Sequence, residues 1–528
     1  MVYAYTAKQI RAAEKPLLDA QSSTDELMKS AAHAVFEAAE AMLAWPDPLA
    51  DLRQHRKTLL LVGKGGNGGD ALYAGAELAL AGHTVDAWLA WGSAHEPALE
   101  AFRNAGGTVL TELPDGVREY RFAIDGLTGL GGAGGLDEQT GQVIQGLADW
   151  YAHVLAVDVP SGIDADTGET GDIHVIADAT VTFGGWRVAH GLAPECGIQL
   201  LADPHLADGQ SISDNLSPFD AAAMLHRAVP GDHQWPDSLT PLTATNVPSM
   251  EPRFHDDKYS GGVVGIRAGS DTYPGAAILT AAGAVHASPS MVRYAGPQAD
   301  EVVRALPEVV VTRKLEDAGR VQAWVFGPGT GTDSTARSEL AYLLGCEEPL
   351  LIDADGLTLI SLDPELRELL RSRTAQTVLT PHDGEFLRLR NAEGISPADR
   401  LAETRALAES LNCIVLRKGR STIISNPRHE SADSVIDAGT SWAATPGSGD
   451  VLSGITCAHL ANAAARWGKD AFLLDTQPVV IHAVASALAA QTEFGMAPAR
   501  ALAIAQAVPA ATAKLHQFSG LPAASTQR

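Results

Sequence analysis

The chain has 528 residues, too many for one hydrophobic core, because domains usually run to about 100–200 residues. Its 38 basic and 64 acidic residues give a formal net charge of −26, which argues against a nucleic-acid-binding surface. We expect a cytoplasmic protein without a membrane partner, because the apolar runs are far shorter than the roughly 20 residues that cross a bilayer and the N-terminus lacks the apolar core of a secretory signal.

The chain begins with a helical arm and then alternates between short strands and helices. Apolar residues recur at helical spacing over residues 7–43, with Ser23 or Thr24 as the predicted cap of the second half. Short apolar runs then alternate with amphipathic stretches, which is typical of a parallel sheet flanked by helices. The predicted strands are residues 58–62, 84–89, 121–124 and 154–157.

A glycine-rich loop follows the first predicted strand of the sheet. It reads Gly-Lys-Gly-Gly-Asn-Gly-Gly-Asp over residues 63–70 and leads into a helix predicted over residues 71–81, which Gly82 ends. Glycines allow positive φ and close backbone approach, and the free amides at a helix start bind anions. The loop therefore predicts a phosphate-bearing ligand, with a plain tight turn as the alternative.

Two further strand ends carry aspartates. Asp125 lies in Ile-Asp-Gly-Leu-Thr-Gly over residues 124–129, and Asp158 opens Asp-Val-Pro-Ser-Gly-Ile-Asp over residues 158–164. Ligands of open parallel sheets bind outside the carboxyl ends of the strands, where both aspartates are expected. A single aspartate there is often only a helix cap, but three such sites together favour a functional edge.

Over residues 1–220 this set resembles the NAD(P)H-hydrate epimerase family, whose motifs include a Gly-x-Gly-Asn-Asn-Gly-Gly-Asp loop and an Asp-x-Pro-Ser-Gly turn. The resemblance implies a Rossmann-like parallel α/β sandwich in which Asp158 is catalytic. It implies a potassium ion held by Asn67, Asp125 and Ser161, for which hard oxygen ligands are suited. Asp158 would also bind the hydrated nicotinamide nucleotide, together with Gly66, Asn67, Gly68, Gly69, Asp70, Gly129, Leu130, Gly131, Gly132, Ala133, Gly134 and Gly135.

A weaker pattern rich in Asp, Pro and Ser, over residues 201–253, separates two α/β domains. We place the first domain at residues 1–225, a linker at 226–252, the second domain at 253–518 and a disordered tail at 519–528. The second domain has a helix predicted near residues 274–286. Its predicted strands are residues 261–266, 321–326, 350–352, 377–379 and 413–416.

The most explicit motif of the second domain is Pro-Gly-Ser-Gly-Asp-Val-Leu-Ser-Gly over residues 446–454. Glycines precede Asp450, and the apolar run behind it predicts a buried helix whose N-terminal amides face a phosphate. Asp450 could then accept a proton from a hydroxyl group that attacks this phosphate. An Asp helix cap is the alternative, but the upstream turn Lys-Gly-Arg-Ser-Thr over residues 418–422 argues for a nucleotide site.

Over residues 240–515 these motifs resemble the ribokinase-like superfamily and its ADP-dependent NAD(P)H-hydrate dehydratases, with residues 353–357 and 380–385 as distinguishing pieces. The resemblance implies a ribokinase-like α/β fold with Asp450 as a catalytic residue. It also implies that the nucleotide is bound by Lys418, Gly419, Arg420, Ser421, Thr422 and Gly449. The residues implied to contact the hydrated nicotinamide nucleotide are Ala277, Gly331, His382 and Asp450.

The two resemblances together predict a metabolite-repair enzyme for hydrated NADH and NADPH. The first domain would interconvert the R and S hydrates, and the second would dehydrate the S epimer with ADP and magnesium, yielding NAD(P)H, AMP and phosphate, with ATP as the alternative to ADP. A homo-oligomer is expected. Two alternatives stay open at this point: a ribokinase-like small-molecule kinase with an accessory domain, and a binding or scaffold protein without activity.

Overall fold

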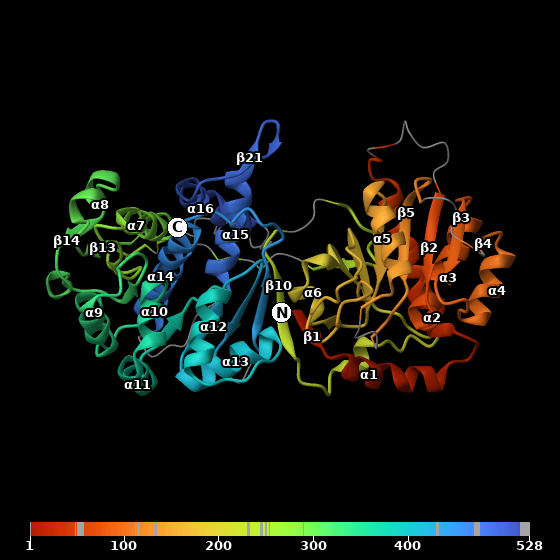
Figure 1. Ribbon diagram of the computed structural model, residues 1–528, viewed down its shortest axis with the longest axis horizontal. Helices are drawn as coiled ribbons and strands as arrows, with labels where there is room; N and C mark the ends of the chain where they lie inside the picture. The colour runs from red at the N-terminus through yellow and green to blue at the C-terminus, as the bar shows by residue number, and fades with distance from the viewer. Residues whose placement is uncertain are drawn as a thin grey trace. The chain divides into compact units, whose positions relative to one another are not determined.

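The computed structural model describes two compact units of the chain, shown in Figure 1. The described residues are 2–47, 49, 57–110, 112, 117–130, 135–229, 233–242, 247–248, 251–252, 254–288, 290–428, 432–468 and 476–517. Unit 1 comprises residues 1–225 and 230–242, and unit 2 comprises residues 226–229 and 243–528. No described helix has the length and apolar character needed to span a membrane.

Unit 1 is built on a predominantly parallel sheet with the strand order β11-β9-β7-β6-β5-β2-β3-β4, in which only β11 runs antiparallel to its neighbour. The strands are β2 (Lys57–Val62), β3 (Val85–Leu89), β4 (Thr108–Leu110), β5 (Tyr120–Gly126), β6 (His153–Val157), β7 (Ala179–Phe183), β9 (Ile198–Ala202) and β11 (Thr240–Pro241). Its helices are α1 (Ala7–Ala20), α2 (Glu26–Leu43), α3 (Gly66–Leu80), α4 (Glu96–Asn104), α5 (Glu138–Asp149) and α6 (Ala189–Leu192), with 3-10 turns at Pro194–Cys196 and Ser213–Leu216. Outside this sheet, β1 (Val2–Tyr5) pairs with β8 (Trp186–Arg187) and with the start of β10 (Ala223–Arg227).

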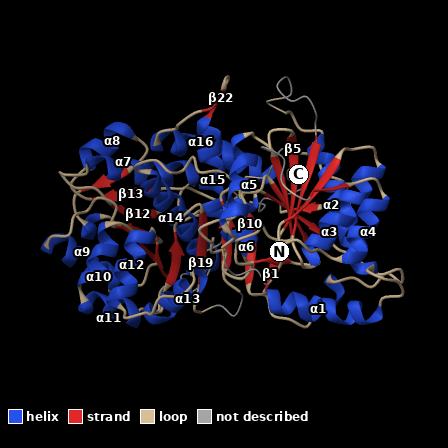
Figure 2. Ribbon diagram, turned by 45° about the vertical axis from the view of Figure 1, so that its right-hand side comes forward, coloured by secondary structure: helices blue, strands red, loops and turns tan. Residues whose placement is uncertain are grey.

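Alternate residues of the central strands face opposite helical layers, as the two-residue period of a strand requires. Leu60 and Val62 of β2 pack in a core with α2, α3 and α4, whereas Leu59 and Leu61 pack in a second core with α5. Figure 2 shows strands enclosed by helices in this way. The four strands predicted for this unit are confirmed, and so is the fold class of a parallel α/β sandwich.

Unit 2 carries a second sheet with the strand order β14-β13-β12-β15-β16-β17-β18-β19-β20, parallel from β14 to β18 and antiparallel thereafter. The strands are β12 (Val264–Arg267), β13 (Val292–Ala295), β14 (Val310–Thr312), β15 (Ala323–Phe326), β16 (Leu350–Ile352), β17 (Thr377–Leu379), β18 (Ile414–Arg417), β19 (Ser421–Ser425) and β20 (Ser434–Asp437), with a separate hairpin of β21 (Gln491–Thr492) and β22 (Gly495–Met496). The helices are α7 (Pro274–Ala287), α8 (Ala299–Ala305), α9 (Ser334–Leu344), α10 (Asp355–Leu362), α11 (Pro364–Ser372), α12 (Asp383–Ala392), α13 (Arg400–Leu411), α14 (Ser448–Trp467), α15 (Gln477–Ala490) and α16 (Ala501–Gln517), with a 3-10 turn at Leu315–Asp317.

Close contact between α7 and α14 explains one glycine of the 446–454 motif. A Cβ atom on Gly454 would lie 2.1 Å from the carbonyl oxygen of Thr280, and one on Gly283 would lie 2.3 Å from that of Val451. Only glycine lets the two backbones approach so closely. Part of this motif therefore positions α14 against the core.

Two local predictions differ from the structure. Helix α2 begins after Asp25, whose backbone is left-handed at φ 57° and whose side chain makes no cap hydrogen bond, so the predicted cap at Ser23 or Thr24 is wrong. The segment predicted as a linker over residues 226–252 is in part packed: β11 pairs with β9, and Leu239 and Leu242 beside it are buried. The predicted tail at 519–528 lies outside the described residues.

Candidate active sites

The glycine loop of unit 1 ends earlier than predicted, because α3 begins at Gly66 rather than at residue 71. Gly65 caps the helix without a side-chain hydrogen bond, so the first amides of α3 remain open to a ligand. Gly68 is required sterically, since a Cβ atom there would lie 2.2 Å from the carbonyl oxygen of Gly63. The predicted phosphate-binding residues 66–70 therefore form the first turns of a helix.

Asn67, Asp125 and Ser161 come together at the ends of β5, β6 and α3. The Ser161 backbone N–H and hydroxyl group both donate to Asp125, each at 2.7 Å. The Asn67 side-chain amide donates to the carbonyl oxygens of Thr128 at 3.0 Å and Val157 at 2.7 Å. Three segments far apart in the sequence are thus joined at one point.

This cluster suits a monovalent cation by the chemistry of its donors. Asp125 is fully buried, and burial raises the pKa of its carboxyl group although three hydrogen bonds oppose this effect. No cationic side chain forms an ion pair with Asp125 among the described residues. Within the described part of the chain, the Oδ1 atom of Asn67 accepts no hydrogen bond either. This atom lies 2.7 Å from the position that a Cβ atom on Gly129 would occupy. A buried carboxylate beside neutral oxygens is compatible with potassium.

Asp158 is held in a strained and almost fully buried position. Its backbone is left-handed at φ 67°, and its Oδ1 atom lies 2.8 Å from Nη2 of Arg187 and accepts a hydrogen bond from Thr182 at 2.8 Å. The side chains of Arg187 and Asp158 are only 1% and 4% exposed. Left-handed geometry at a non-glycine residue costs about 1–3 kcal/mol and is concentrated at functional sites.

Arg187, Thr182 and His190 were missed by sequence reasoning, because nothing in the local pattern links them to Asp158. His190 accepts the backbone N–H of Arg187 at 3.0 Å through Nδ1, so its Nε2–H donates to the carbonyl oxygen of Asp158 at 2.7 Å. Burial lowers the pKa of His190 to about 4, so the ring is neutral near pH 7. The ring therefore fixes the backbone of Asp158 without adding a charge.

These elements enclose a cavity of about 620 Å³ in unit 1. Of the predicted substrate residues, Gly66, Asn67, Asp70, Gly129, Leu130 and Asp158 line it. Gly68 and Gly69 are buried behind the wall, and Gly135 lies elsewhere, near Asp172. Residues 131–134 lie outside the described part of the chain. Arg11, Glu14 and Leu18 of α1 form another wall of this cavity.

In unit 2, Asp450 stands in the first turn of α14, behind a left-handed Gly447 at φ 83°. Burial, together with the nearby charge of Asp353, raises the pKa of Asp450 to about 7, although Lys418 opposes the effect. Lys418 lies 2.7 Å from Oδ1 of Asp353, whose Oδ2 atom accepts a hydrogen bond from Ser453 at 2.7 Å. Asp450 is thus a carboxyl group that changes its charge near neutral pH, as a general base requires.

The predicted nucleotide residues surround a cavity of about 570 Å³ beside Asp450. It is lined by His382, Lys418, Gly419, Arg420, Thr422 and Gly449, together with residues of the 438–448 segment and α15. Ser421 does not line it: the residue is 2% exposed and lies in β19. Gly449 is a close neighbour of Lys418, whose Nζ atom would lie 3.6 Å from an added Cβ atom.

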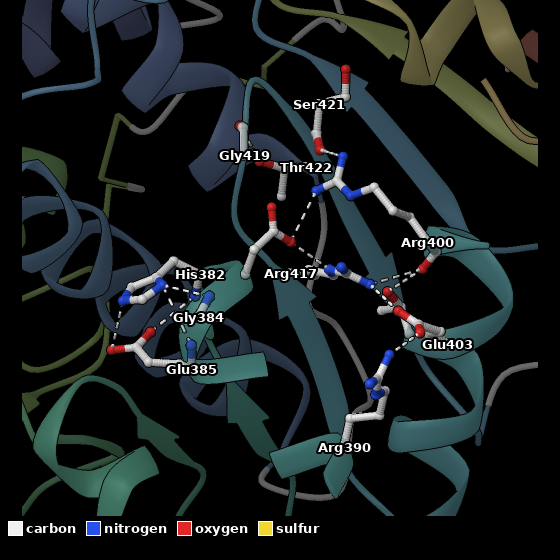
Figure 3. A network of polar contacts seen from close by, with 12 residues as sticks. His382, Gly384, Glu385, Arg390, Arg400, Glu403, Arg417, Gly419, Ser421 and Thr422 are labelled. Atoms are coloured by element: carbon white, nitrogen blue, oxygen red, sulfur yellow. Dashed lines mark hydrogen bonds and ion pairs between the residues drawn. The ribbon is translucent and has the colours of Figure 1, made fainter. Parts of the chain in front are cut away.

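His382 begins α12 and serves as its cap. Its Nδ1 atom accepts the backbone N–H groups of Gly384 at 3.0 Å and Glu385 at 3.4 Å, and Glu385 in turn accepts the His382 backbone N–H at 2.9 Å. Figure 3 shows this cap apart from the group formed by Arg417, Glu403 and Arg390. The His382 side chain is 59% exposed and lines the nucleotide cavity, and its Nε2 atom lies 3.5 Å from Oε1 of Glu385.

Of the four substrate residues predicted in unit 2, Ala277, Gly331 and Asp450 are not among the residues that line this cavity. The backbone N–H of Gly331 donates to Asp355 at 2.9 Å, which ties the Gly331 turn to the start of α10. Ala277 is fully buried in α7 against Gly269, so none of its atoms is accessible to a ligand in this conformation. Contacts of Ala277 and Gly331 with substrate stay predictions.

A charged network behind the cavity supports the strand that carries Lys418. Arg417 pairs with Asp383 at 2.7 Å and with Glu403 at 3.0 Å, and its guanidinium group lies 3.9 Å from the centre of the Phe386 ring. Glu403 also pairs with Arg390. The ion pairs of Arg417, the last residue of β18, with the first turns of α12 and α13 therefore fix the position of the adjacent Lys418. Sequence reasoning missed this network, because no motif includes Arg417.

Comparison with known proteins supports the same division of the chain. Residues 264–507 match the family model described as NAD(P)H-hydrate dehydratase, and residues 24–189 match the model described as YjeF-related protein N-terminus. The chain is 45% identical to a bifunctional NAD(P)H-hydrate repair enzyme of Corynebacterium glutamicum, over 97% of this chain and 98% of that protein. It is 40% identical to the one of Mycobacterium tuberculosis strain CDC 1551, over 88% and 90%, and 30% identical to the one of Escherichia coli K12, over 86% and 84%.

Among solved structures, an ADP/ATP-dependent NAD(P)H-hydrate dehydratase from Bacillus subtilis, crystallised with ATP and Mg²⁺, aligns over 51% of this chain and 95% of its own, with 22% identity and a TM-score of 0.41. The identity and coverage of the curated relatives, together with two matched family models, are decisive. The chain belongs to the family of bifunctional NAD(P)H-hydrate repair enzymes.

Proposed function

We propose that the two units divide the repair of hydrated NADH and NADPH between them. Unit 1 is the epimerase, which interconverts the R and S hydrates, and unit 2 is the dehydratase, which restores NAD(P)H from the S hydrate at the expense of ADP. The fusion has a chemical reason: the hydrate has a stereocentre at C6, and a stereoselective dehydratase alone leaves the other epimer unused.

One observation carries the assignment of unit 2: Asp450 lies in the first turn of α14, beside the cavity that holds the predicted nucleotide residues. We assign the AMP portion of ADP to the turn of Lys418, Gly419 and Thr422, and the phosphates to the free amides of α14. Asp450 would remove the proton of the C6 hydroxyl group as this oxygen attacks the β-phosphorus atom. Phosphorylation turns a poor leaving group into a good one. The lone pair of the ring nitrogen then expels phosphate from C6, and loss of a proton from C5 restores the C5=C6 double bond of NAD(P)H.

The nucleotide requirement rests on the same residues. The charge of the Lys418 amine acts on Asp450, and although burial lowers the pKa of this amine, Asp353 and Glu385 raise it above the usual value. A permanently charged amine there would neutralise phosphate charge, and magnesium bound with the nucleotide would supply more positive charge. We propose ADP as the phosphate donor, with ATP as a possible substitute.

The dehydratase assignment is tested by product analysis. Incubation of the S hydrate of NADH with ADP and Mg²⁺ is expected to release AMP and inorganic phosphate in equal amounts with NADH. Phosphorus NMR separates these products from a phosphorylated hydrate. A stable phosphorylated product that accumulates instead would identify the enzyme as a kinase of the ribokinase type.

We assign epimerisation to Asp158, at the base of the unit 1 cavity. Phosphates bound at the start of α3 would anchor the nucleotide through Gly66, Asn67 and neighbouring amides. This anchoring would direct the hydrated ring towards Asp158, whose carboxylate can move a proton at the C6 hydroxyl group. The Asn67, Asp125 and Ser161 cluster would hold potassium, which supplies a fixed positive charge when bound.

The potassium site predicts an ion-specific gain in stability. Potassium chloride is expected to raise the unfolding temperature of unit 1 above its value in choline chloride, by about 3–6 °C at roughly ten times the Kd. Asp125→Asn is expected to abolish the difference, whereas Asp19→Asn, on an exposed side chain of α1, is expected to keep it. Differential scanning calorimetry in the two salts measures the effect, and an equal response in both salts for the unaltered chain excludes the site.

The raised pKa of Asp450 predicts the pH dependence of dehydration. A general base acts only when ionised, so kcat is expected to fall as pH drops through about 7, tenfold per pH unit well below it. Initial rates at saturating ADP, measured from about pH 5.5 to about pH 8.5 on both sides of this pKa, give the profile. A rate independent of pH over this interval contradicts the role given to Asp450.

A homo-oligomer in the cytoplasm stays a prediction. Light scattering of the purified chain checks the oligomeric state.

A further inference from the structure

The cavity of unit 1 contains more carboxyl groups than the roles assigned above use. Glu14, Asp70 and Asp158 all line it, together with Arg11 and Arg187. Arg187 forms its ion pair with Asp158. Neither the Glu14 nor the Asp70 side chain forms an ion pair or hydrogen bond among the described residues, so two of the three carboxyl groups lack a partner.

Glu14 reaches the cavity from α1, outside the residues 24–189 that match the family model. Arg11, Glu14 and Leu18 follow one another at helical spacing on the cavity face of α1, while Ile10, Ala13 and Leu17 are buried in the core. The packing of α1 against the core therefore orients Glu14 towards the same cavity that Asp158 lines.

The chemistry of epimerisation at C6 needs two proton-transfer groups. When the C6–O bond breaks, the leaving oxygen needs a proton, and when water adds to the opposite face of the ring, the water must lose one. A single carboxylate bound to Arg187 on one side of the ring serves only one of these steps, because the two oxygens lie on opposite faces.

We propose that Glu14 is the second catalytic residue of the epimerase, acting as the acid in one direction while Asp158 acts as the base. This proposal rests on the epimerase function assigned to unit 1. Glu14 gives its proton to the C6 hydroxyl group, the C6–O bond breaks, water leaves, and the lone pair of the ring nitrogen forms a C=N bond. Water then adds to C6 from the other face and gives a proton to Asp158, while the electron pair returns to nitrogen. In the reverse direction the two residues exchange roles.

The surroundings of Glu14 fit an acid that works near neutral pH. Burial raises the pKa of Glu14 to about 7, and Asp158 adds to this while Arg187 and Arg11 oppose it. Burial and then the charges of Asp158, Glu14 and Asp25 also raise the pKa of Asp70 well above its usual value. A proton-transfer group is most effective when its pKa lies near the working pH.

The test is the epimerisation rate of the full-length chain from the pure R hydrate, followed by chromatographic separation of the epimers at several pH values. Glu14→Gln is expected to lower kcat by on the order of 10²–10⁴-fold with little change in KM. The rate of the unaltered chain is expected to fall as pH rises through about 7, because the acid must be protonated, and this alkaline limb is expected to vanish in Glu14→Gln.

Two further variants separate this role from a structural one. Glu14→Asp keeps a carboxyl group and is expected to retain the alkaline limb at a lower rate, while Asp19→Asn, on an exposed position of the same helix, is expected to leave the rate unchanged. Full activity of Glu14→Gln, or an alkaline limb that is lost in Asp70→Asn and kept in Glu14→Gln, overturns the proposal. An unaltered chain that does not epimerise would instead refute the function assigned to unit 1.

Discussion

Replacement of Asp450 by Asn is expected to lower kcat for dehydration by on the order of 10²–10⁴-fold, because the amide cannot accept the proton of the C6 hydroxyl group. KM for the hydrate is expected to change little. Epimerisation is expected to stay at the rate of the unaltered chain, since Asp450 belongs to unit 2. Both rates are measured on the same preparation, with NADH absorbance for dehydration and chromatography for the epimers.

The control for this variant is Asp317→Asn, which removes one carboxylate from an exposed position of the same unit. It is expected to keep both activities. Equal loss of epimerisation and dehydration in Asp450→Asn would show that the division of labour between the units is wrong. Unchanged dehydration would show that another group takes the proton.

Replacement of Asp158 by Asn is expected to stop epimerisation and also to destabilise unit 1. The Arg187 side chain is 1% exposed, so the variant leaves an almost fully buried guanidinium group without its carboxylate. Loss of one partner of a buried ion pair costs about 3–5 kcal/mol. Processing of an evenly mixed sample of hydrates is then expected to stall when about half of it is consumed, because the dehydratase is stereoselective.

A double variant separates the chemical role of Asp158 from its structural one. Asp158→Asn combined with Arg187→Met removes both charges, so it is expected to regain part of the lost stability, since a buried pair replaced by apolar groups is often neutral. Epimerisation is expected to stay absent. Calorimetry measures the stability, and recovery of epimerisation in the double variant would show that Asp158 acts only through Arg187.

The glycine loop shows which features of the first site could be predicted from the sequence and which could not. The strand, the loop and the following helix were predicted correctly, because glycine spacing and apolar periodicity are local signals. The start of α3 at Gly66 was not, because glycines have a low helix propensity and the close approach of Gly68 to the backbone of Gly63 has no local sequence signal. The cluster of Asn67, Asp125 and Ser161 was implied by the resemblance to the epimerase family, whereas the rule that strand ends share an edge predicted the positions of Asp125 and Asp158 alone.

The partners of Asp158 could not be predicted in this way. Arg187 and Thr182 lie on different strands from Asp158, and their contacts depend on the register between strands rather than on any local pattern. The same holds for Lys418 and Asp353 in unit 2, which follow β18 and β16, the two strands on either side of β17. The position of Glu14 in the unit 1 cavity likewise depends on how α1 packs against the core.

The central claim is that one chain carries both repair activities. The most direct measurement is complete turnover of an even mixture of R and S hydrates of NADH by the purified chain with ADP and Mg²⁺, under conditions where spontaneous epimerisation is slow. The account predicts that all of the hydrate is converted to NADH, with one AMP and one phosphate released per NADH. Conversion that stops at half of the hydrate, or that releases no AMP, would contradict it.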